Sequence, residues 1–508
     1  MNRSIDTAPH PDFRVYSAGN FAEIAPPRWS VMSWSLVGDP AERGLRAFAK
    51  RVMPSARWAT GSHYVFVGYF SCRPYHNLSA MCHLTQELPG ITGSDVTRAY
   101  FEDVPPPERE LHGHCSAVQR ALALPRMARE FHRLRPRLAS LEADVALLEE
   151  EASSALDSGW GIALGRAMET ATRVLDDAWD VHYTTSSSLV PAGALQRRVG
   201  DRMLARWDEI EPLVTRPPEL PWSRLFDAAA GGEVEESRFL DAPFYEAADA
   251  HEPWTSYARA FQPHAPRDLG ARGPEQDEIA DVVWRMHRGR RRAGIEQISR
   301  AVGDTLQARE ESKALSMRAL HVFRRALPSL AAEAGVGGDA WAYLRIGELL
   351  SPERRASLGA IAETRRVEVE EALSEEMPDE LVVPEPGASA GVATARPGSR
   401  RGERKPSGVS PGVASGKVAT LGDALLAGEP NGHGPVILVC ESADAGIQSL
   451  LPNVAGLITL RGSMLSHIST LAREYGIPAV VNHPLAESLR AGQQVVLNGS
   501  TGQVEVIA

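Results

Sequence analysis

The sequence is short of cysteine, of long apolar runs and of excess positive charge. Its four cysteines are far apart and form no CxxC pair, so neither a disulfide framework nor a zinc site is expected, and a reduced, cytoplasmic protein is indicated. No run of about 18 apolar residues could cross a membrane, and Met1–Phe13 lacks the apolar core of a signal peptide. The formal net charge of −11 argues against nucleic acid or a membrane surface as the main partner.

The sequence also contains no recognisable nucleotide-binding motif. No GxxxxGK(S/T) phosphate loop occurs, and no metal-ligand spacing is evident. What remains is a globular protein whose 508 residues allow two or three domains.

Two long apolar stripes predict a pair of helices in the first half of the chain. Apolar residues recur at spacings of three and four between Met127 and Leu148, and again between Leu164 and Ala178. A short Ser/Gly-containing join, 153–161, predicts an antiparallel hairpin. A coiled-coil dimer is the alternative, but Pro136 interrupts its heptads and favours an internal bundle.

The stretch Gly456–Val481 predicts a strand, a tight loop, a helix and a second strand. The strands are expected at Leu457–Leu460 and Ala479–Val481. The helix is expected to open around Leu465 and to end before Gly476, because a glycine followed by a proline ordinarily stops a helix.

His467 is then expected in the first turn of this helix. Backbone N–H groups there have no intrahelical partner, and the helix dipole is positive. This environment disfavours a protonated imidazole and favours a phosphoryl group bonded to the ring. Ser463 and Ser466 can add hydroxyl donors to that group. The alternative is that His467 only caps or packs, as many histidines do.

The motif around His467 resembles the phosphohistidine signature of the PEP-utilising enzymes, such as PEP synthase, pyruvate phosphate dikinase and rifampicin phosphotransferase. The matching residues are Gly462-Ser-Met-Leu-Ser-His467, Ala472–Val480, Gly408–Gly416, Thr459, Leu489–Gly492 and Asn498–Gly502. Two departures are visible, because Ser463 replaces the second glycine of the family's pair and Asn498 replaces its usual closing aspartate. The resemblance implies that His467 carries phosphate, stabilised by Ser463, Ser466, Thr459 and Arg473.

The N-terminal part resembles the substrate-binding domain of rifampicin phosphotransferase-like proteins in the order of four short motifs. These are Asn20–Pro27, Trp34–Leu36, Tyr75–Ser79 and Leu88–Gly90. From composition alone, the aromatic residues are core, Met32–Leu36 is part of a packed irregular segment, and His63–Phe70 is strand-like.

Positive residues of two further motifs are candidates for the substrate site. Arg272 lies in Gly270–Pro274, where Ala271 replaces the histidine that the family commonly has. Arg309 and Lys313 are four apart on one helix face, where like charges repel unless an anion compensates. Glu310 can compensate, and a solvated helix face is the alternative.

These patterns predict an α+β multidomain protein. A mainly helical substrate-binding domain is expected at 1–382, a flexible Pro/Gly/Ser/Arg-rich linker at 383–407, and a compact α/β phosphohistidine swivelling domain at 408–508.

The resemblance implies a phosphotransferase component. His467 would carry phosphate to a hydroxyl of a small organic substrate, with dehydration as a further outcome. ATP and Mg²⁺ would be bound by a separate ATP-grasp-type protein, because no such domain is recognisable here. Two alternatives stay open: a lyase or dehydratase that uses His467 directly as acid or base, and a non-catalytic phosphocarrier or regulatory protein.

Overall fold

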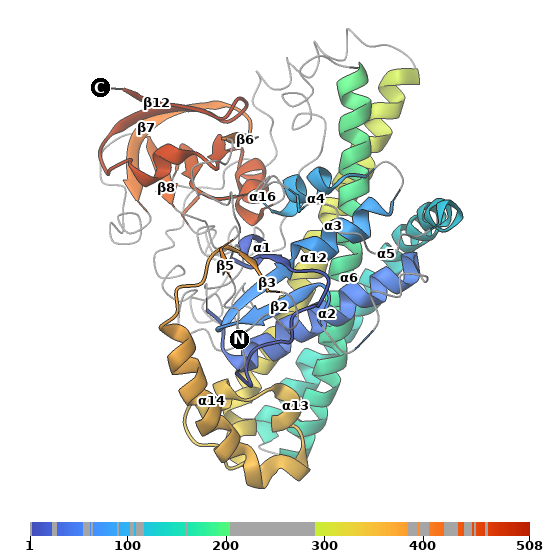
Figure 1. Ribbon diagram of the computed structural model, residues 1–508, viewed down its shortest axis with the longest axis vertical. Helices are drawn as coiled ribbons and strands as arrows, with labels where there is room; N and C mark the ends of the chain where they lie inside the picture. Colours follow the sequence, from blue (N-terminus) through green and yellow to red (C-terminus); the bar gives the residue numbers. More distant parts are fainter. Residues whose placement is uncertain are drawn as a thin grey trace.

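The structure is a computed structural model, and its described residues fall into a mainly helical N-terminal unit and a C-terminal unit built on a sheet (Figure 1). They are residues 3–22, 28–53, 61, 64–88, 91–101, 106–107, 116–158, 161–203, 290–384, 394–395, 406–420, 435–440, 450–451, 454–462 and 466–507.

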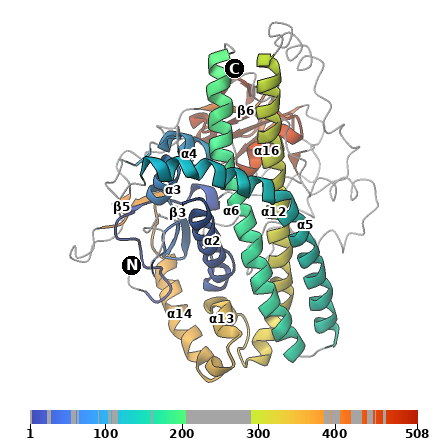
Figure 2. The same ribbon diagram turned by 90° about the vertical axis from the view of Figure 1, so that its right-hand side faces the viewer.

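Four long helices form the body of the N-terminal unit. α6 contacts the other three, and it runs beside α12 along the long axis of the molecule in both views (Figures 1 and 2). The bounds are α2, Val31–Val52; α5, Ala117–Ser158; α6, Gly161–Met203; and α12, Arg290–Glu333.

The predicted hairpin is confirmed by α5 and α6, which pack on each other. The stripe residues from Leu134 to Leu148 and from Leu164 to Ala178 are buried in the main apolar core. Pro136 lies inside α5 without ending it.

A five-stranded antiparallel sheet packs beside these helices, in the order β2-β3-β1-β4-β5. It pairs residues near the N-terminus with residues near 380, so that the first and last parts of this unit close on each other. The strands are β1, Val15–Ser17; β2, Val67–Phe70; β3, Arg73–Asn77; β4, Glu380–Val382; and β5, Thr394–Ala395.

Short helices complete the N-terminal unit. They are α1, Gly19–Ala22; α3, Leu78–Gln86; α4, Gly93–Tyr100; α13, Ile346–Leu349; and α14, Leu358–Leu373. In the described part of the chain, 3-10 turns lie at Ala340–Tyr343, Pro352–Ser357 and, in the C-terminal unit, Pro484–Glu487.

One local prediction is wrong: Met32–Leu36 is helical rather than irregular. Ser30 caps α2, because its hydroxyl oxygen accepts a hydrogen bond from the backbone N–H of Ser33. The apolar and aromatic residues that suggested irregular packing are the buried face of this helix. Trp34, for example, stacks on Tyr69 with ring centroids 5.0 Å apart.

The C-terminal unit is a seven-stranded mixed sheet in the order β12-β11-β7-β8-β9-β10-β6. Its central strands β7 to β10 are parallel neighbours, whereas β6, β11 and β12 pair antiparallel. The bounds are β6, Ser407–Ser410; β7, Val413–Thr420; β8, Val436–Cys440; β9, Gly456–Thr459; β10, Ala479–Val481; β11, Gln494–Asn498; and β12, Gln503–Ile507.

The strands expected at Leu457–Leu460 and Ala479–Val481 are confirmed as β9 and β10. The α+β class is likewise consistent with the helical N-terminal unit and this mixed sheet. The domain bounds 1–382, 383–407 and 408–508 stay predictions. Within the expected linker, β5 pairs with β4, and residues 385–393 and 396–405 lie outside the described part of the chain.

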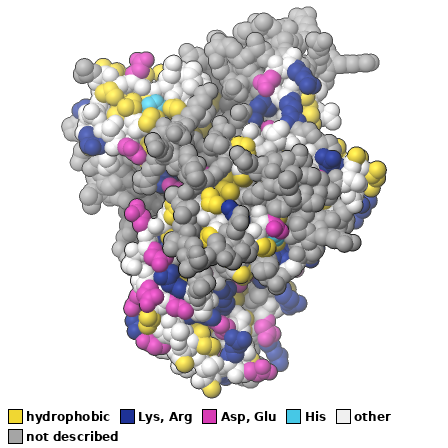
Figure 3. All heavy atoms as spheres, in the orientation of Figure 1, with side chains coloured by type: hydrophobic (Ala, Val, Ile, Leu, Met, Phe, Trp, Pro, Cys, Tyr) yellow, Lys and Arg dark blue, Asp and Glu magenta, His cyan; other side chains and the backbone are white. Residues whose placement is uncertain are grey.

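The surface of the described residues is mixed in charge. Acidic and basic side chains alternate over the part of the molecule that holds α13 and α14 (Figure 3). Hydrophobic side chains gather at the start of α5, where Val118, Leu122 and Leu124 are exposed. A search of the described helices finds none that is long and apolar enough to span a bilayer.

Candidate functional site

The candidate phosphate-carrying histidine begins helix α16. This helix spans His467–Glu474 and follows β9, so His467 lies beyond the carboxyl end of a parallel strand, where α/β sheets usually bind ligands. The side chain of His467 lies outside the described part of the structure. Its backbone position, the first residue of a helix, is the one that the sequence predicted to within two residues.

Ser466 is the N-cap of α16 and is fully buried. The backbone N–H of Ser469 donates to Ser466 Oγ (3.3 Å), and the hydroxyls of Ser466 and Ser469 are 2.8 Å apart. This cap fixes where the helix starts and therefore the direction in which its first N–H groups point. Ser463, the other serine of the motif, is outside the described residues.

After β9, the backbone at Gly462 lies close to the side chains of Val481 and Asn482. The backbone N–H of Gly462 donates to Asn482 Oδ1 (3.1 Å), and Asn482 has a φ of 58°. A Cβ at position 462 would lie 2.9 Å from Val481 Cγ1. This contact gives a steric reason for the glycine at this position of the motif.

Thr459 and Arg473 lie on opposite sides of this turn. Thr459 ends β9, and its buried Oγ1 has no hydrogen-bond partner among the described residues, which suits a hydroxyl that awaits a ligand. Arg473 lies in the last turn of α16, about 9 Å along the helix axis from His467, and donates to the carbonyl oxygen of Val409 (3.4 Å). A role of either residue in phosphate binding stays a prediction.

An ion pair that the sequence did not reveal joins this turn to the N-terminal unit. Both terminal guanidinium nitrogens of Arg461, Nη2 and Nη1, contact the carboxylate of Asp379, at 2.7 and 3.0 Å. Arg73 of β3 contacts the same carboxylate at 2.6 Å. Arg461 and Asp379 are largely buried, with 10% and 17% of their side chains exposed. The segment that leads to His467 is therefore docked on the N-terminal unit.

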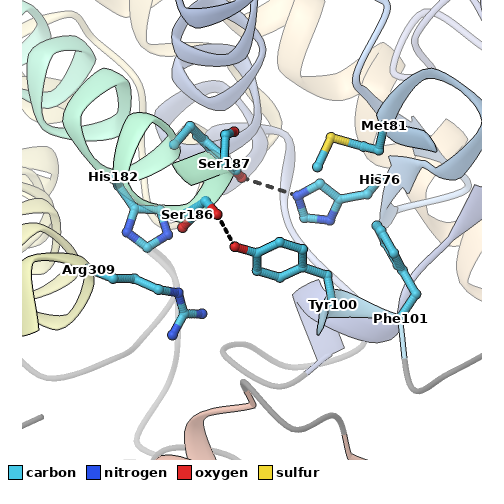
Figure 4. A pocket seen from close by; sticks show the side chains of 9 residues that line it. His76, Met81, Tyr100, Phe101, His182, Ser186, Ser187 and Arg309 are labelled. Carbon is cyan, nitrogen blue, oxygen red and sulfur yellow. Dashed lines mark hydrogen bonds between the residues drawn. The ribbon is translucent and has the colours of Figure 1, made fainter. Parts of the chain in front are cut away.

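A second polar site lies inside the N-terminal unit, between β3, α3, α4, α6 and α12 (Figure 4). Its cavity volume is about 20 Å³, room for a water molecule or two. The lining residues are His76, Met81, Tyr100, Phe101, His182, Tyr183, Ser186, Ser187 and Arg309.

The polar groups of this pocket are tied to one another. His76 Nε2 and the Tyr183 hydroxyl share a hydrogen bond of 3.2 Å, and the Tyr100 hydroxyl donates to the carbonyl oxygen of Ser186 (Figure 4). Two buried atoms, His76 Nδ1 and Ser186 Oγ, have no partner among the described residues. A buried polar atom without a partner costs free energy, so each of these two atoms favours a hydrogen-bonding group inside the cavity.

Burial sets the protonation states in the pocket. It lowers the pKa of His76 to about 3 and raises that of Tyr100 to about 12. The pKa of His182 is well below its usual value because of burial and, next, the positive charges of Arg309 and Lys313. Near neutral pH both histidines are therefore neutral, and Tyr100 keeps its proton.

Arg309 and Lys313 are buried, so the solvated-face interpretation of these residues is wrong. Only 4% and 2% of the two residues are exposed. Arg309 Nη1 contacts Glu310 Oε1 at 2.6 Å, which confirms the expected compensation. Arg309 lines the cavity, and Lys313 acts on His182 through its charge. Arg272 is outside the described residues.

Sequence reasoning missed the contribution of α6 to this pocket, although a signal is present. His182–Ser188 is an unbroken polar run, and every residue of it is buried. A polar run inside a long helix with an apolar stripe is unusual unless a site needs it. His76 lies within the Tyr75–Ser79 motif that was singled out by resemblance only.

Metal ligands are not gathered in the described parts of either unit. A search of the described residues finds no group of three or more His, Cys, Asp or Glu that could hold a metal ion. Cys72, Cys82 and Cys440 are buried.

Comparison with known families identifies the class of the C-terminal unit. Residues 432–502 match the mobile domain of PEP-utilising enzymes, which confirms the resemblance inferred from the motif around His467.

Relatives of this region are phosphotransferases and a biosynthetic transferase. The chain is 38% identical over 101 residues to the uncharacterised phosphotransferase YvkC of Bacillus subtilis, covering 20% of this chain and 12% of the relative. It is 35% identical over 101 residues to rifampicin phosphotransferase of Streptomyces sviceus, covering 20% and 11%. It is 41% identical over 99 residues to the prodigiosin synthesizing transferase PigC of Serratia marcescens, covering 19% and 11%. The matched region thus spans about an eighth of these relatives.

Proposed function

We propose that this protein transfers a phosphoryl group from His467 to a hydroxyl of a small organic molecule. The observation that carries the proposal is the position of His467 as the first residue of a capped helix, within a region that matches the mobile domain of PEP-utilising enzymes. Two of the relatives are named as phosphotransferases, which supports the same reaction class.

The start of α16 suits the phosphorylated form of the histidine. Its first N–H groups and the positive end of the helix dipole favour a phosphoryl group with two negative charges over a protonated imidazole. Thr459, with its buried hydroxyl oxygen, lies at the end of the preceding strand. Catalysis of phosphoryl transfer rests mainly on positioning of the reactants and on electrostatic stabilisation of the phosphoryl oxygens.

The transfer step balances without a further reactant. The phosphorus–nitrogen bond breaks, and its electron pair stays on the ring nitrogen of His467. The acceptor oxygen forms the new phosphorus–oxygen bond. The proton that the acceptor hydroxyl loses is matched by the proton that the freed imidazole nitrogen gains, so the product is a phosphate ester and a neutral histidine. Elimination of phosphate from that ester, together with a proton from the neighbouring carbon, would amount to dehydration of the acceptor.

The donor in this proposal is ATP with Mg²⁺, bound by an ATP-grasp-type unit outside these 508 residues. The domain that carries His467 would reach that unit by swinging about the segment 383–407, in a hinged rigid-body motion. Such a swing would bring one histidine to two sites that cannot overlap.

The test uses potassium phosphoramidate, a chemical donor that phosphorylates imidazoles, so that no partner is needed. Trypsin releases Gly462–Arg473, which contains a single histidine. We expect an acid-labile, base-stable phosphoryl group on this peptide, formed at least ten times faster than on the exposed His132 of α5. His467→Gln should lose it, with His132→Gln as the matched control.

The outcomes separate the three functions. Equal labelling of His467 and His132 would contradict a phosphate site at α16 and leave the direct acid–base lyase. Selective labelling without transfer to any small molecule would leave the regulatory phosphocarrier. Selective labelling followed by transfer is the result that the phosphotransferase requires.

A further inference from the structure

Asn482 is a buried residue in a backbone conformation that few side chains adopt. It directly follows β10, is 4% exposed and has a φ of 58°. Asparagine tolerates this left-handed region better than most residues. In the described part of the chain, the other non-glycine residues with positive φ are Ser71 and Cys72, which form the turn of the β2–β3 hairpin. Asn482 is not in a hairpin turn, and residues held in such conformations are often found at ligand sites.

One end of the Asn482 side-chain amide holds the segment that leads to His467. Its Oδ1 accepts a hydrogen bond from the backbone N–H of Gly462 (3.1 Å). The next residue fixes the same place, because the backbone N–H of His483 donates to the carbonyl oxygen of Thr459 (3.1 Å). Since β9 and β10 are parallel neighbours, Thr459 and Asn482 both lie at the carboxyl end of these strands.

The other end of this amide has hydrogen-bonding capacity to spare. Asn482 Nδ2 carries two N–H donors, and neither is used by another described residue. Thr459 Oγ1 is buried and also without a partner among the described residues. It faces the same segment, because a Cβ at Gly462 would lie 3.5 Å from it. Two groups that can donate hydrogen bonds therefore converge beside Gly462.

The surroundings of these two donors favour an anion. The first N–H groups of α16 and the positive end of its helix dipole lie at the start of that helix, which Ser466 caps. In the docked arrangement of the two units, Arg461 directs its guanidinium to Asp379. Neutral N–H and O–H donors therefore have a large share in stabilising a phosphoryl group at this edge of the sheet.

We propose that Asn482 is a ligand of the phosphoryl group carried by His467. Its Nδ2 donates to a phosphoryl oxygen while its Oδ1 keeps Gly462 in place, so one amide both binds the group and positions the segment beside it. This inference rests on the proposed phosphotransfer from His467. Asn482 lies outside the motifs that resemble those of the PEP-utilising enzymes.

Two substitutions separate binding of the phosphoryl group from a role in holding Gly462 alone. Asn482→Asp keeps an oxygen for the N–H of Gly462 but replaces the donor with a negatively charged oxygen, which repels a phosphoryl group. Asn482→Gly removes both ends of the amide and keeps the backbone conformation, because glycine adopts a φ of 58° without strain.

Asn498→Asp is the matched control for the added charge. Asn498 Oδ1 also accepts backbone N–H groups, those of Ser500 (2.9 Å) and Thr501 (3.1 Å). Asn498 pairs with Val413, the first residue of β7. It therefore lies at the amino end of the parallel strands, at the opposite edge of the sheet from Asn482.

The first measurement is the rate at which potassium phosphoramidate phosphorylates His467 in the full chain, followed by mass spectrometry of the tryptic peptide Gly462–Arg473. We expect Asn482→Asp to lower this rate about tenfold or more, and Asn498→Asp to change it by less than about twofold, because repulsion between charges weakens with distance.

The second measurement is a pH titration of the phosphorylated proteins by phosphorus NMR. A hydrogen-bond donor favours the doubly negative form of the phosphoryl group, so its loss in Asn482→Gly should raise the pKa of that group by about half a unit or more. A residue that only held Gly462 would leave this pKa unchanged.

Three results would overturn the assignment of Asn482. They are labelling of Asn482→Asp at the wild-type rate, equal slowing in Asn482→Asp and Asn498→Asp, and an unchanged phosphoryl pKa in Asn482→Gly. Thermal unfolding shows whether each variant is folded, and the titration of Asn482→Gly decides if Asn482→Asp is not. A wild-type protein whose His467 is not labelled selectively would instead count against the proposed function.

Discussion

The contact between Arg461 and Asp379 should couple the two units of the protein energetically. Both terminal guanidinium nitrogens of Arg461 reach the carboxylate of Asp379. The side chains of Arg461 and Asp379 are 10% and 17% exposed. Hydrogen bonds between charged groups in such a setting contribute about 1.5–3 kcal/mol. Taking about 2 kcal/mol, the pair should shift the balance between docked and undocked units about 30-fold.

A double-mutant cycle measures this coupling. Arg461→Met, Asp379→Asn and the double variant are unfolded in denaturant, and the coupling is the part of their effects on the free energy of unfolding that does not add. We expect about 2 kcal/mol. The control is the cycle of Arg73→Met with Asp379→Asn, two residues that both belong to the N-terminal unit. It should give a similar coupling energy. A coupling below about 0.5 kcal/mol for Arg461 with a normal value for Arg73 would refute the docking role of Arg461.

Two further predictions concern a close backbone approach and acid stability. Gly462→Ala should destabilise the C-terminal unit by about 1–3 kcal/mol in thermal unfolding, because the new Cβ would lie 2.9 Å from Val481 Cγ1. The control is Gly359→Ala on α14, whose new Cβ would meet nothing within 4 Å and which should be neutral or stabilising. Equal effects of the two substitutions would contradict the steric argument. Hydrogen bonding to Arg3 lowers the pKa of Glu375 to about 2 from 4.5, so the stability it contributes is present above pH 4.5 and is lost as the pH falls towards 2. Glu375→Gln should make the free energy of unfolding less dependent on pH in that window only. An unchanged pH dependence would count against the Arg3–Glu375 pair.

The elements predicted correctly are those whose signals are local. The hairpin of α5 and α6 follows from apolar periodicity, and strands β9 and β10 follow from the two short apolar runs that flank the helix of His467. The helix expected to open around Leu465 begins two residues later, at His467, as α16. The failure at Met32–Leu36 came from treating tryptophan and nearby prolines as signs of irregular packing, when a serine cap at Ser30 was the stronger signal.

The parts that could not be predicted depend on contacts between distant segments. The five-stranded sheet pairs β1 with β4 across more than 360 residues, and no local pattern encodes that pairing. The pocket collects side chains from β3, α3, α4, α6 and α12. Arg309 was predicted from its spacing to Lys313, but that spacing could not reveal burial, which depends on how α6 covers α12.

The size of the docking contact bears on the predicted swing of the histidine-bearing domain. A domain that must leave its docked position in each turnover cannot be held by many kcal/mol, since each 1.4 kcal/mol slows release about tenfold. An ion pair of about 2 kcal/mol favours the docked state without by itself preventing release. It also lies in the loop that leads to His467, so a doubly negative phosphoryl group there would compete with Asp379 for Arg461. We therefore expect the coupling in the cycle above to fall by about half or more after phosphorylation with phosphoramidate, measured on the same four proteins. A coupling that phosphorylation leaves unchanged would show that Arg461 serves only as a fixed structural contact.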